Sequence, residues 1–334
     1  MNKTIQTAHG AGGKKTERLI SDIFKKHFDN PLLTSDDAAV LPGFEGRIVT
    51  STDGFIVSPR FFPGGNIGRL SVCGSVNDVA CMGAMPTYLT AAFVIEEGFS
   101  FDELETIVRS MAETAKEAGV VIVAGDTKVV ERGQVDGLFI TTTGIGTLPD
   151  GVNIAGNQAR PGDAVVVTGD IGRHGSAILL AREDFGFHTD IESDDAPLAH
   201  LVRRMLTVSH RIHTIRDATR GGVGTVLYEI AKASDAGIRL MDEDLPVAPP
   251  VKSITAMLGL DPLYLACEGR LVVFVPKADA DAVVAALREE RYGENACVIG
   301  EVVSEHPGKV SIVTAIGTER FLSAPAGELL PRIC

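Results

Sequence analysis

Hydrophobic positions along the chain follow two patterns: short apolar runs, and longer segments in which apolar residues recur at helical spacing. The short runs are rich in Val, Ile and Thr and are bounded by Gly, Pro or Asp, which is typical of β-strands. Strands are predicted at residues 48–51, 89–95, 120–123, 138–143, 164–167, 271–275, 298–303 and 310–313.

The clearest helical pattern spans residues 102–118. Ser100 and Glu103 form a capping box at its start, and Gly119 is suited to end it. Its apolar face consists of Leu104, Ile107, Val108, Met111 and Ala115. Further helices are predicted at residues 15–28, 68–82, 175–183, 222–234 and 278–290.

A turn-rich stretch at residues 148–163 separates two halves, each with strands and helices in mixed order. This pattern predicts an α+β fold with two domains of similar size. We expect domains at residues 1–150 and 151–322, followed by a flexible tail at residues 323–334.

Composition narrows the class of protein. The 334 residues include 45% hydrophobic and 22% charged residues, which suits a globular protein with a sizeable core. The net charge of −13 leaves no basic stripe and argues against a nucleic-acid role. No apolar run reaches the roughly 18 residues of a membrane span, and the first residues do not resemble a signal peptide. Five irregularly spaced cysteines argue against a disulfide framework and favour the cytoplasm.

The chain ends in Cys334, which follows a hinge-like stretch at residues 323–327. Prolines on both sides of this thiol-bearing segment exclude a helix interior. A thiol on such a segment is expected to be exposed, to reach other proteins and to swing, which suits a group carrier. A frayed terminus that happens to end in cysteine is the alternative.

Aspartates recur at predicted strand ends and turns: Asp36, Asp37, Asp53, Asp78 and Asp126. Mg²⁺ prefers oxygen ligands and bridges one or two carboxylates to substrate phosphates. Singly, each aspartate suits a turn or cap. Together, with Asn77 beside Asp78 and Lys128 just after Asp126, they favour a metal–phosphate site.

Glycine-rich segments offer two candidate phosphate contacts. The first contains Gly12 and Gly13, but it lacks the spacing and the Ser or Thr of a Walker A motif, so a flexible start is equally compatible. The second runs from residue 216 to residue 224, where Asp217 and Arg220 precede a helix and Gly221 and Gly222 open its N-terminus to an anion. A surface ion pair at a helix start is the alternative for this segment.

Glu268 is a lone acid between apolar segments, and it is either a tuned base or a turn residue. The histidines form no zinc signature.

Six motifs occur in order along the chain: Asp-Asp-Ala-Ala-Val at 36–40, Phe-Phe-Pro-Gly-Gly-Asn-Ile-Gly at 61–68, Asn-Asp-Val-Ala at 77–80, Gly-Asp-Thr-Lys-Val-Val at 125–130, Asp-Ala-Thr-Arg-Gly-Gly at 217–222 and the terminal Pro-Arg-Ile-Cys. With these motifs the chain resembles the HypE family of hydrogenase maturation factors, which are carbamoyl dehydratases. That family belongs to an ATP-binding superfamily that includes aminoimidazole ribonucleotide synthetase. The resemblance covers nearly the whole chain, and the terminal motif is its most specific part. Cys267 departs from the family pattern, in which Asn precedes the acid.

The resemblance implies a two-domain fold that dimerises through the N-terminal sheet. It implies that a HypF-type carbamoyltransferase loads Cys334, and that ATP and Mg²⁺ drive dehydration of the carbamoyl group to a thiocyanate. A HypC–HypD-type scaffold would then receive the cyano group for the iron of [NiFe]-hydrogenase. The implied catalytic residues are Cys334, Glu268 and Lys128, with nucleotide contacts at Gly12, Gly13, Asn77, Thr127, Arg220, Gly221 and Gly222. The implied metal ligands are Asp36, Asp37, Asp53, Asp78, Asp126 and Asp217.

Two other functions fit part of the sequence. A small-molecule kinase or synthetase of the same superfamily would share the aspartates but would not need Cys334. A nucleotide-regulated carrier without catalytic activity would present the thiol only.

Overall fold

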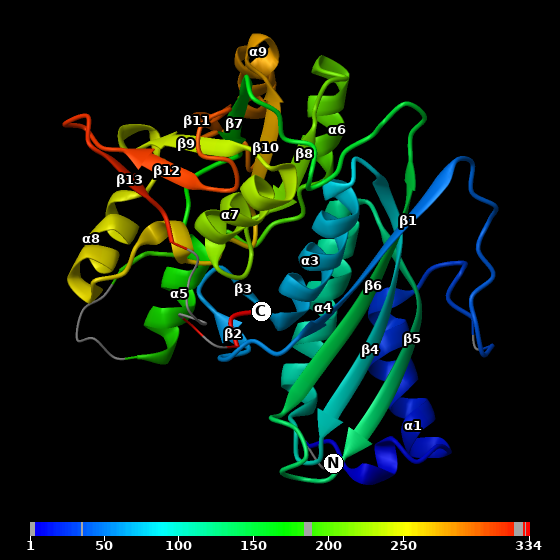
Figure 1. The fold of residues 1–334 in the computed structure, drawn as a ribbon. Coiled ribbons are helices and arrows are strands. Elements are labelled where there is room, and N and C mark those ends of the chain that lie inside the picture. The colour runs from blue at the N-terminus through cyan, green and yellow to red at the C-terminus, as the bar shows by residue number, and fades with distance from the viewer. Residues whose placement is uncertain (1–3, 35, 184–188, 324–329, 331) are drawn as a thin grey trace.

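The computed structural model describes residues 4–34, 36–183, 189–323, 330 and 332–334. Two main sheets lie side by side, and the C terminus lies between them (Figure 1). The first sheet has the order β1-β6-β4-β5, with β1 (Arg47–Phe55), β4 (Met85–Glu96), β5 (Val121–Val130) and β6 (Leu138–Leu148). Only β4 and β5 are parallel; the other pairs are antiparallel.

The second sheet has the order β13-β12-β9-β11-β7-β10-β8. Its strands are β7 (Asp163–Val167), β8 (Thr214–Asp217), β9 (Gly237–Met241), β10 (Leu271–Pro276), β11 (Cys297–Val303), β12 (Val310–Val313) and β13 (Glu319–Phe321). A short hairpin of β2 (Phe61–Phe62) and β3 (Gly65–Asn66) leads into the first long helix.

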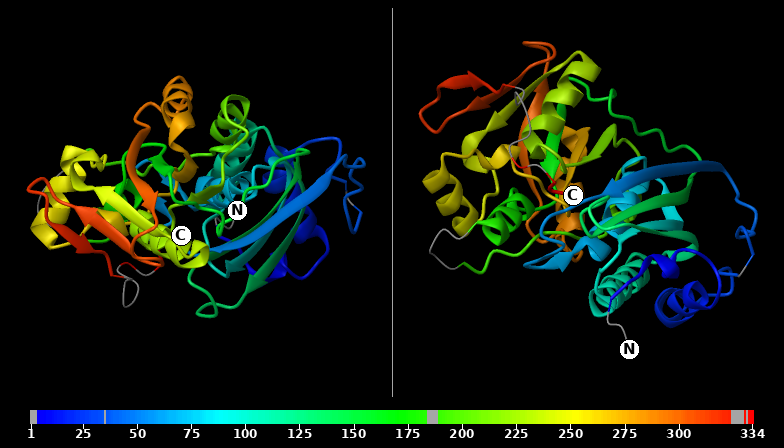
Figure 2. Two further views of the ribbon diagram at one scale, coloured as in Figure 1. Left: turned by 45° about the horizontal axis from the view of Figure 1, so that its top comes forward. Right: turned by 90° about the horizontal axis from the view of Figure 1, so that it is seen from below.

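The helices flank these sheets (Figure 2). They are α1 (Lys14–Leu19), α2 (Lys26–Phe28), α3 (Ile67–Cys81), α4 (Phe101–Ala118), α5 (Arg173–Arg182), α6 (Ala199–Val208), α7 (Gly222–Ser234), α8 (Pro249–Leu258) and α9 (Lys277–Arg288). A π-helical turn, η2 (Ile20–Lys25), joins α1 to α2, and short 3-10 turns are η1 (Thr7–His9), η3 (Asp242–Asp244) and η4 (Pro262–Tyr264). No described helix is long and apolar enough to cross a membrane.

The helix predicted with the clearest pattern is confirmed in detail. The Ser100 side chain accepts a hydrogen bond from the Glu103 N–H, and Gly119 ends α4 in the left-handed conformation with φ 73°. Its apolar face is buried, with Leu104, Ile107 and Met111 fully enclosed. By contrast, the helix predicted at 15–28 is divided into α1, η2 and α2.

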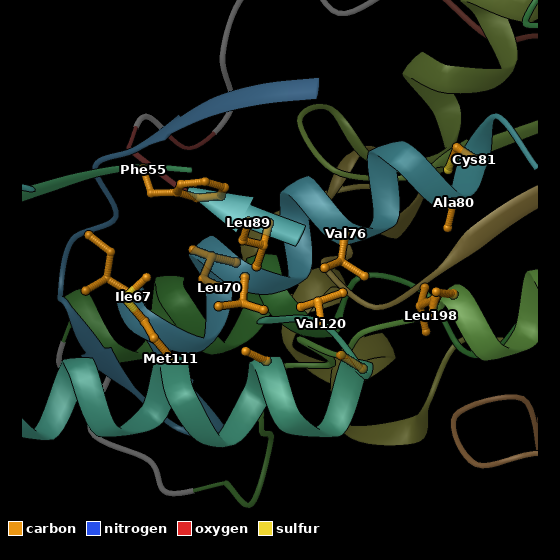
Figure 3. Close-up of a cluster of buried hydrophobic side chains, with 14 of the residues drawn as sticks. Phe55, Ile67, Leu70, Val76, Ala80, Cys81, Leu89, Met111, Val120 and Leu198 are labelled. Atoms are coloured by element: carbon orange, nitrogen blue, oxygen red, sulfur yellow. The ribbon is translucent and has the colours of Figure 1, made fainter. Parts of the chain in front are cut away.

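Helix α3 is the element that joins the two halves. It packs on α4 and the first sheet, and it also contacts β8 and α6 of the second half. Nearly all of its side chains are therefore buried, including the small residues Ser71, Ser75 and Ala80. The close-up of this core shows Ile67 and Leu70 of α3 near Met111 of α4, and Val76 farther along α3 near Val120 (Figure 3).

The opposite face of the first sheet is open. Exposed and half-buried positions alternate along β1, where Ile48, Thr50 and Thr52 lie on the exposed side, and Thr141 of β6 is exposed as well. A half-open antiparallel sheet is a common surface for contact with a second sheet. The predicted domain division at residue 150 stays a prediction, and it falls between the last strand of the first sheet and the first strand of the second.

Candidate functional site

A cavity of about 760 Å³ lies between the two halves, and we call it the inter-domain cavity. It is formed by β1, α3, the end of β8, the start of α7, the segment at 264–268 and the C terminus. The predicted site residues that line it are Asp53, Asp78, Asp217, Arg220, Gly221, Glu268 and Cys334. These residues come from both halves of the chain, so only the packing of the two halves creates the cavity.

Three carboxylates crowd one side of this cavity. Burial and the neighbouring Asp78 raise the pKa of Asp53 to about 6, and the same two causes raise the pKa of Asp217 to about 7. Ser51 donates a hydrogen bond of 2.5 Å to Asp78. Mutual repulsion in a low-dielectric site favours protons or cations between such groups. The donor set therefore fits Mg²⁺, which binds through a few carboxylates together with phosphate oxygens.

Glu268 lies deeper in the cavity wall, with only 3% of its surface exposed. Its Oε1 atom has no hydrogen-bond partner among the described residues. Burial is the main cause that raises its pKa well above the usual range, and the charges of Asp195 and Asp217 add to it. An unpaired buried carboxyl group at a cavity is suited to accept or donate a proton.

The start of α7 offers a site for an anion. Gly221 caps this helix with φ 75°, and no side chain caps its first turn. A Cβ atom at Gly222, where φ is 62°, would lie 2.5 Å from the Leu265 carbonyl oxygen, so only glycine fits there. Arg220 stands beside this open helix end and adds a positive charge.

The last residues of the chain occupy the cavity, contrary to the expectation of an exposed thiol. Ile333 is 6% exposed and belongs to the main core, and Cys334 is half-buried against that core. Burial, followed by the charge of Glu268, raises the pKa of the Cys334 thiol above its usual range. The apolar Ile333 side chain explains the difference, because its burial favours docking of the tail. The hinge at 324–327 lies outside the described residues.

A second group of predicted residues lies elsewhere, in a pocket of about 620 Å³ between α1, η2 and the edge strand β5, which we call the β5 pocket. Its predicted members are Gly12, Asp36, Asp37, Asp126, Thr127 and Lys128. Lys128 Nζ lies 3.0 Å from Asp126 Oδ2, and this contact lowers the pKa of Asp126. Both side chains are more than 60% exposed.

The single chain therefore does not gather the six predicted metal ligands. Three line the inter-domain cavity and three line the β5 pocket. Within the part of the chain that the structure describes, no group of three or more His, Cys, Asp and Glu side chains is arranged to hold a metal ion. Ligand oxygens have to complete any metal site.

Asn77 does not line either pocket. It is 2% exposed, and its amide nitrogen donates to the carbonyls of Ala196 and Glu268 while its oxygen accepts from the Leu198 N–H. The predicted nucleotide contact stays a prediction, and in this structure α3 turns the Asn77 side chain toward the second half. Asn77 instead fixes the backbone of Glu268. Gly13 and Gly222 likewise lie outside both pockets.

Several residues at the cavity and the tail were not predicted from the sequence: Thr219, Thr225, Tyr264, His174 and Arg182. Thr219 lies within the motif at 217–222 but was given no role there, and the other four stand in no recognisable spacing. Cys267, the departure from the family pattern, is fully buried and its sulfur accepts a hydrogen bond of 3.1 Å from the Gly172 N–H. This contact joins the segment before Glu268 to the start of α5.

Family models match both halves of the chain. Residues 35–148 match the N-terminal domain of the AIR synthase related proteins, and residues 160–313 match the C-terminal domain. Carbamoyl dehydratase HypE of Rhizobium leguminosarum bv. viciae is 49% identical over 100% of this chain and 96% of its own length. Carbamoyl dehydratase HypE of Escherichia coli K12 is 44% identical over 99% of both chains.

Solved structures agree with these relatives. A crystal structure of hydrogenase maturation protein HypE in complex with ATP is 47% identical, covers 99% of this chain and all of its own, and superposes with a TM-score of 0.95. HypE in a HypE–HypF complex is 49% identical, with 92% of this chain and 99% of that chain covered and a TM-score of 0.82. Thiamine-monophosphate kinase of Stenotrophomonas maltophilia shares the fold, with a TM-score of 0.67 and 20% identity. The match covers 88% of this chain and 95% of that chain. The chain belongs to the HypE family of carbamoyl dehydratases, within the AIR synthase related proteins.

Proposed function

We propose that this protein dehydrates a carbamoyl group carried on Cys334 to a thiocyanate at the expense of ATP, in the maturation of [NiFe]-hydrogenase. The observation that supports this most directly is the terminal thiol docked in the same cavity as the unpaired carboxyl group of Glu268. A small-molecule kinase of this fold would have no use for a thiol in that position.

The reaction needs a better leaving group than an amide oxygen. Transfer of the γ-phosphoryl group of ATP to the carbamoyl oxygen forms the O–P bond and releases ADP. Loss of two protons from the nitrogen and cleavage of the C–O bond then give the thiocyanate and inorganic phosphate. One ATP is consumed for each thiocyanate, because each dehydration uses one phosphoryl group. The thiol must be reloaded before the next round.

Glu268 is placed to take a proton from the carbamoyl nitrogen. Its raised pKa makes it a stronger base once ionised, and its position beside Cys334 keeps it within the same enclosed space. Arg220 and the open start of α7 are suited to the phosphate groups. Asp53, Asp78 and Asp217 would hold Mg²⁺, which neutralises charge on the transferring phosphoryl group when bound.

We further propose that the β5 pocket completes this site in a homodimer. The inter-domain cavity adjoins β1 at one edge of the first sheet, and the β5 pocket adjoins β5 at the other edge. If two such sheets pack through their open faces about a two-fold axis parallel to the strands, the β1 edge of one chain lies near the β5 edge of its partner. Lys128, Asp126 and Gly12 would then contact nucleotide bound in the partner's cavity.

A HypF-type carbamoyltransferase is the proposed source of the carbamoyl group, and a HypC–HypD-type scaffold is the proposed acceptor of the cyano group. HypE in a solved structure is bound to HypF, which supports the first partner. Because the docked thiol is half-buried, both exchanges need the tail to leave the cavity.

The reaction is tested by intact mass spectrometry after incubation with ATP, Mg²⁺ and the carbamoylating partner. A loss of about 18 Da from the carbamoylated C-terminal peptide is expected, and a carbamoylated peptide that persists with ATP would contradict the proposal. Cys334→Ala is the control, and it should show neither carbamoylation nor the loss.

Shared sites are tested by mixing two inactive proteins. One carries Glu268→Gln, and the other carries both Asp126→Asn and Lys128→Ala. Half of randomly formed dimers would be mixed, and each would hold one intact site, so about a quarter of wild-type activity should return. No recovery, with mixed dimers demonstrated, would show that each chain works alone.

A further inference from the structure

We propose that His174 and Arg182 of α5 form a receptor for the last three residues of the chain, which fixes the depth at which Cys334 enters the inter-domain cavity. Both are positioning residues, because they contact the tail backbone and not the reacting atoms. The inference rests on the proposed function in one respect: the position of Cys334 matters because the reaction takes place on its thiol.

The tail is held from one side by the segment that follows β1. The Ile56 N–H donates to a main-chain carboxylate oxygen of Cys334 at 3.3 Å, and the Ser58 N–H donates to the Arg332 carbonyl at 3.2 Å. These two contacts, two residues apart on both segments, resemble a short antiparallel strand pair. They would fix the register of the tail, but they come only from the N-terminal half.

The second half supplies His174. Its Nε2 atom lies 2.8 Å from the Ile333 carbonyl oxygen, and its Nδ1 atom lies 2.8 Å from Ser193 Oγ. Because a carbonyl only accepts hydrogen bonds, Nε2 carries the proton and Nδ1 accepts from the Ser193 hydroxyl. Ser193 Oγ in turn accepts from the Asp195 N–H at 3.1 Å, which fixes the orientation of the ring. The ring is fully buried, and burial lowers its pKa, so the neutral tautomer is favoured.

Arg182 connects the two sides. Its guanidinium group donates to the Ser58 carbonyl and to the Arg332 carbonyl, so one side chain of α5 bridges the tail and the segment after β1. The Arg332 side chain points the other way, donating to the Ile56 carbonyl and to Asp136 at 2.6 Å. Arg332 adopts φ 54°, a backbone conformation that costs energy in a residue with a side chain and persists where surrounding contacts impose it.

This receptor reads the tail mainly through its backbone. The Ile333 carbonyl accepts from His174, the Arg332 carbonyl accepts from Arg182, and the Ile333 side chain is buried in the main hydrophobic core. Loss of a buried partner leaves the other polar group unsatisfied, which disfavours the docked state. Removing either side chain should therefore shift the tail toward the undocked state without touching ATP or the carbamoyl group.

The experiment measures the alkylation rate of Cys334 in unloaded full-length protein without ATP, using iodoacetamide and mass spectrometry of the C-terminal peptide. An undocked thiol regains its ordinary pKa and accessibility, so His174→Ala and Arg182→Ala should each accelerate alkylation by about tenfold. His174→Gln keeps an N–H near the Ile333 carbonyl and should stay within about threefold of wild type. Because no carbamoyl chemistry is involved, the result is independent of the proposed reaction.

Cys297 is the internal control, because it is half-buried in the second half, where its thiol donates to the Asp244 carbonyl at 3.7 Å. Arg211→Ala, which removes an exposed ion pair with Asp279 away from the tail, is the control variant. Unchanged Cys334 alkylation in both alanine variants would overturn the receptor, and a glutamine variant as reactive as the alanine variant would overturn the hydrogen bond of His174. If Cys297 accelerates equally, the fold has loosened, and Arg182→Lys decides. This milder variant keeps the charge but cannot donate to the Ser58 and Arg332 carbonyls together, so it should accelerate Cys334 alone, and no acceleration there overturns the proposal.

Discussion

The inter-domain cavity and the β5 pocket contain similar side chains in opposite environments. In the cavity, Asp53 and Asp217 are half-buried beside Asp78, and desolvation together with its charge raises their pKa values to about 6 and about 7. In the β5 pocket, Asp126 is exposed beside Lys128, and its pKa falls. The same residue type thus becomes a proton or cation acceptor in one place and a permanently charged surface group in the other, because desolvation and the sign of the nearest charge decide its state.

The contrast suggests a division of roles. The inter-domain cavity contains the buried carboxyl group of Glu268, whose raised pKa suits the proton transfer that the dehydration step needs. The β5 pocket has the exposed, paired charges of Asp126 and Lys128, which suit contact with a phosphate brought by a partner.

Glu268→Gln should reduce thiocyanate formation by 100-fold or more, because glutamine cannot accept the amide proton. ATP binding should persist, since the substitution keeps the size of the side chain. The measurement is quench-flow phosphate release and thiocyanate yield with carbamoylated protein. Glu229→Gln, which lines the same cavity but pairs with Arg216 at 3.3 Å, is the matched control and should remain active. A normal yield from Glu268→Gln would remove it from the base role.

Asp195 tests the effect of burial on stability. Both of its side-chain oxygens are buried without a hydrogen-bond partner among the described residues, and burial raises its pKa from 3.8 to about 7. A raised pKa in the folded state means that this carboxyl supports folding at low pH and loses that support as pH rises through 7. Such a change corresponds to at most about 4 kcal/mol.

Asp195→Asn should therefore gain stability relative to wild type between pH 5 and pH 9. Urea unfolding of both proteins across this range measures the difference. Asp279→Asn is the opposite control, because the pKa of that carboxyl is lowered by Arg211. Parallel pH profiles for Asp195→Asn and wild type would show that Asp195 is not titrating in this range.

Nucleotide binding compares the two pockets directly. Asp78→Asn and Asp126→Asn should each weaken binding of ATP in the presence of Mg²⁺ by roughly tenfold, because an amide is a poorer Mg²⁺ ligand than a carboxylate. The effect should shrink when EDTA removes the metal ion. Calorimetric titration gives both values. If only Asp78→Asn weakens binding, the β5 pocket has no part in the nucleotide site.

The smallest effect concerns the ion pair of the β5 pocket. Lys128→Ala should change the free energy of unfolding by less than about 1 kcal/mol, because exposed ion pairs contribute little to stability. The same variant should nevertheless lower the rate of thiocyanate formation if Lys128 contacts phosphate. A large loss of stability would show that the pair holds β5 in place.

Much of the fold follows from local patterns. The long strands and α4 were predicted because their periodicity and caps lie within a few neighbouring residues. The strands β8 and β9 and the helices α6 and α8 were missed, since these short segments are stabilised mainly by packing. The helix expected at 15–28 is confirmed as an unbroken helical segment, but its middle part, Ile20–Lys25, is a π-helix, which apolar spacing does not reveal.

The sequence by itself determined which residue types are present for the chemistry: the aspartates, Glu268, the glycines before α7 and the terminal thiol. Its motifs, including the terminal Pro-Arg-Ile-Cys, indicated the family. Tertiary structure alone decided how these residues are grouped. It divided the aspartates between two pockets, turned Asn77 away from the ligand space and placed His174 and Arg182 against the tail. The reason is physical: spacing along the chain limits only near neighbours, whereas burial and charge depend on segments that meet across the whole fold.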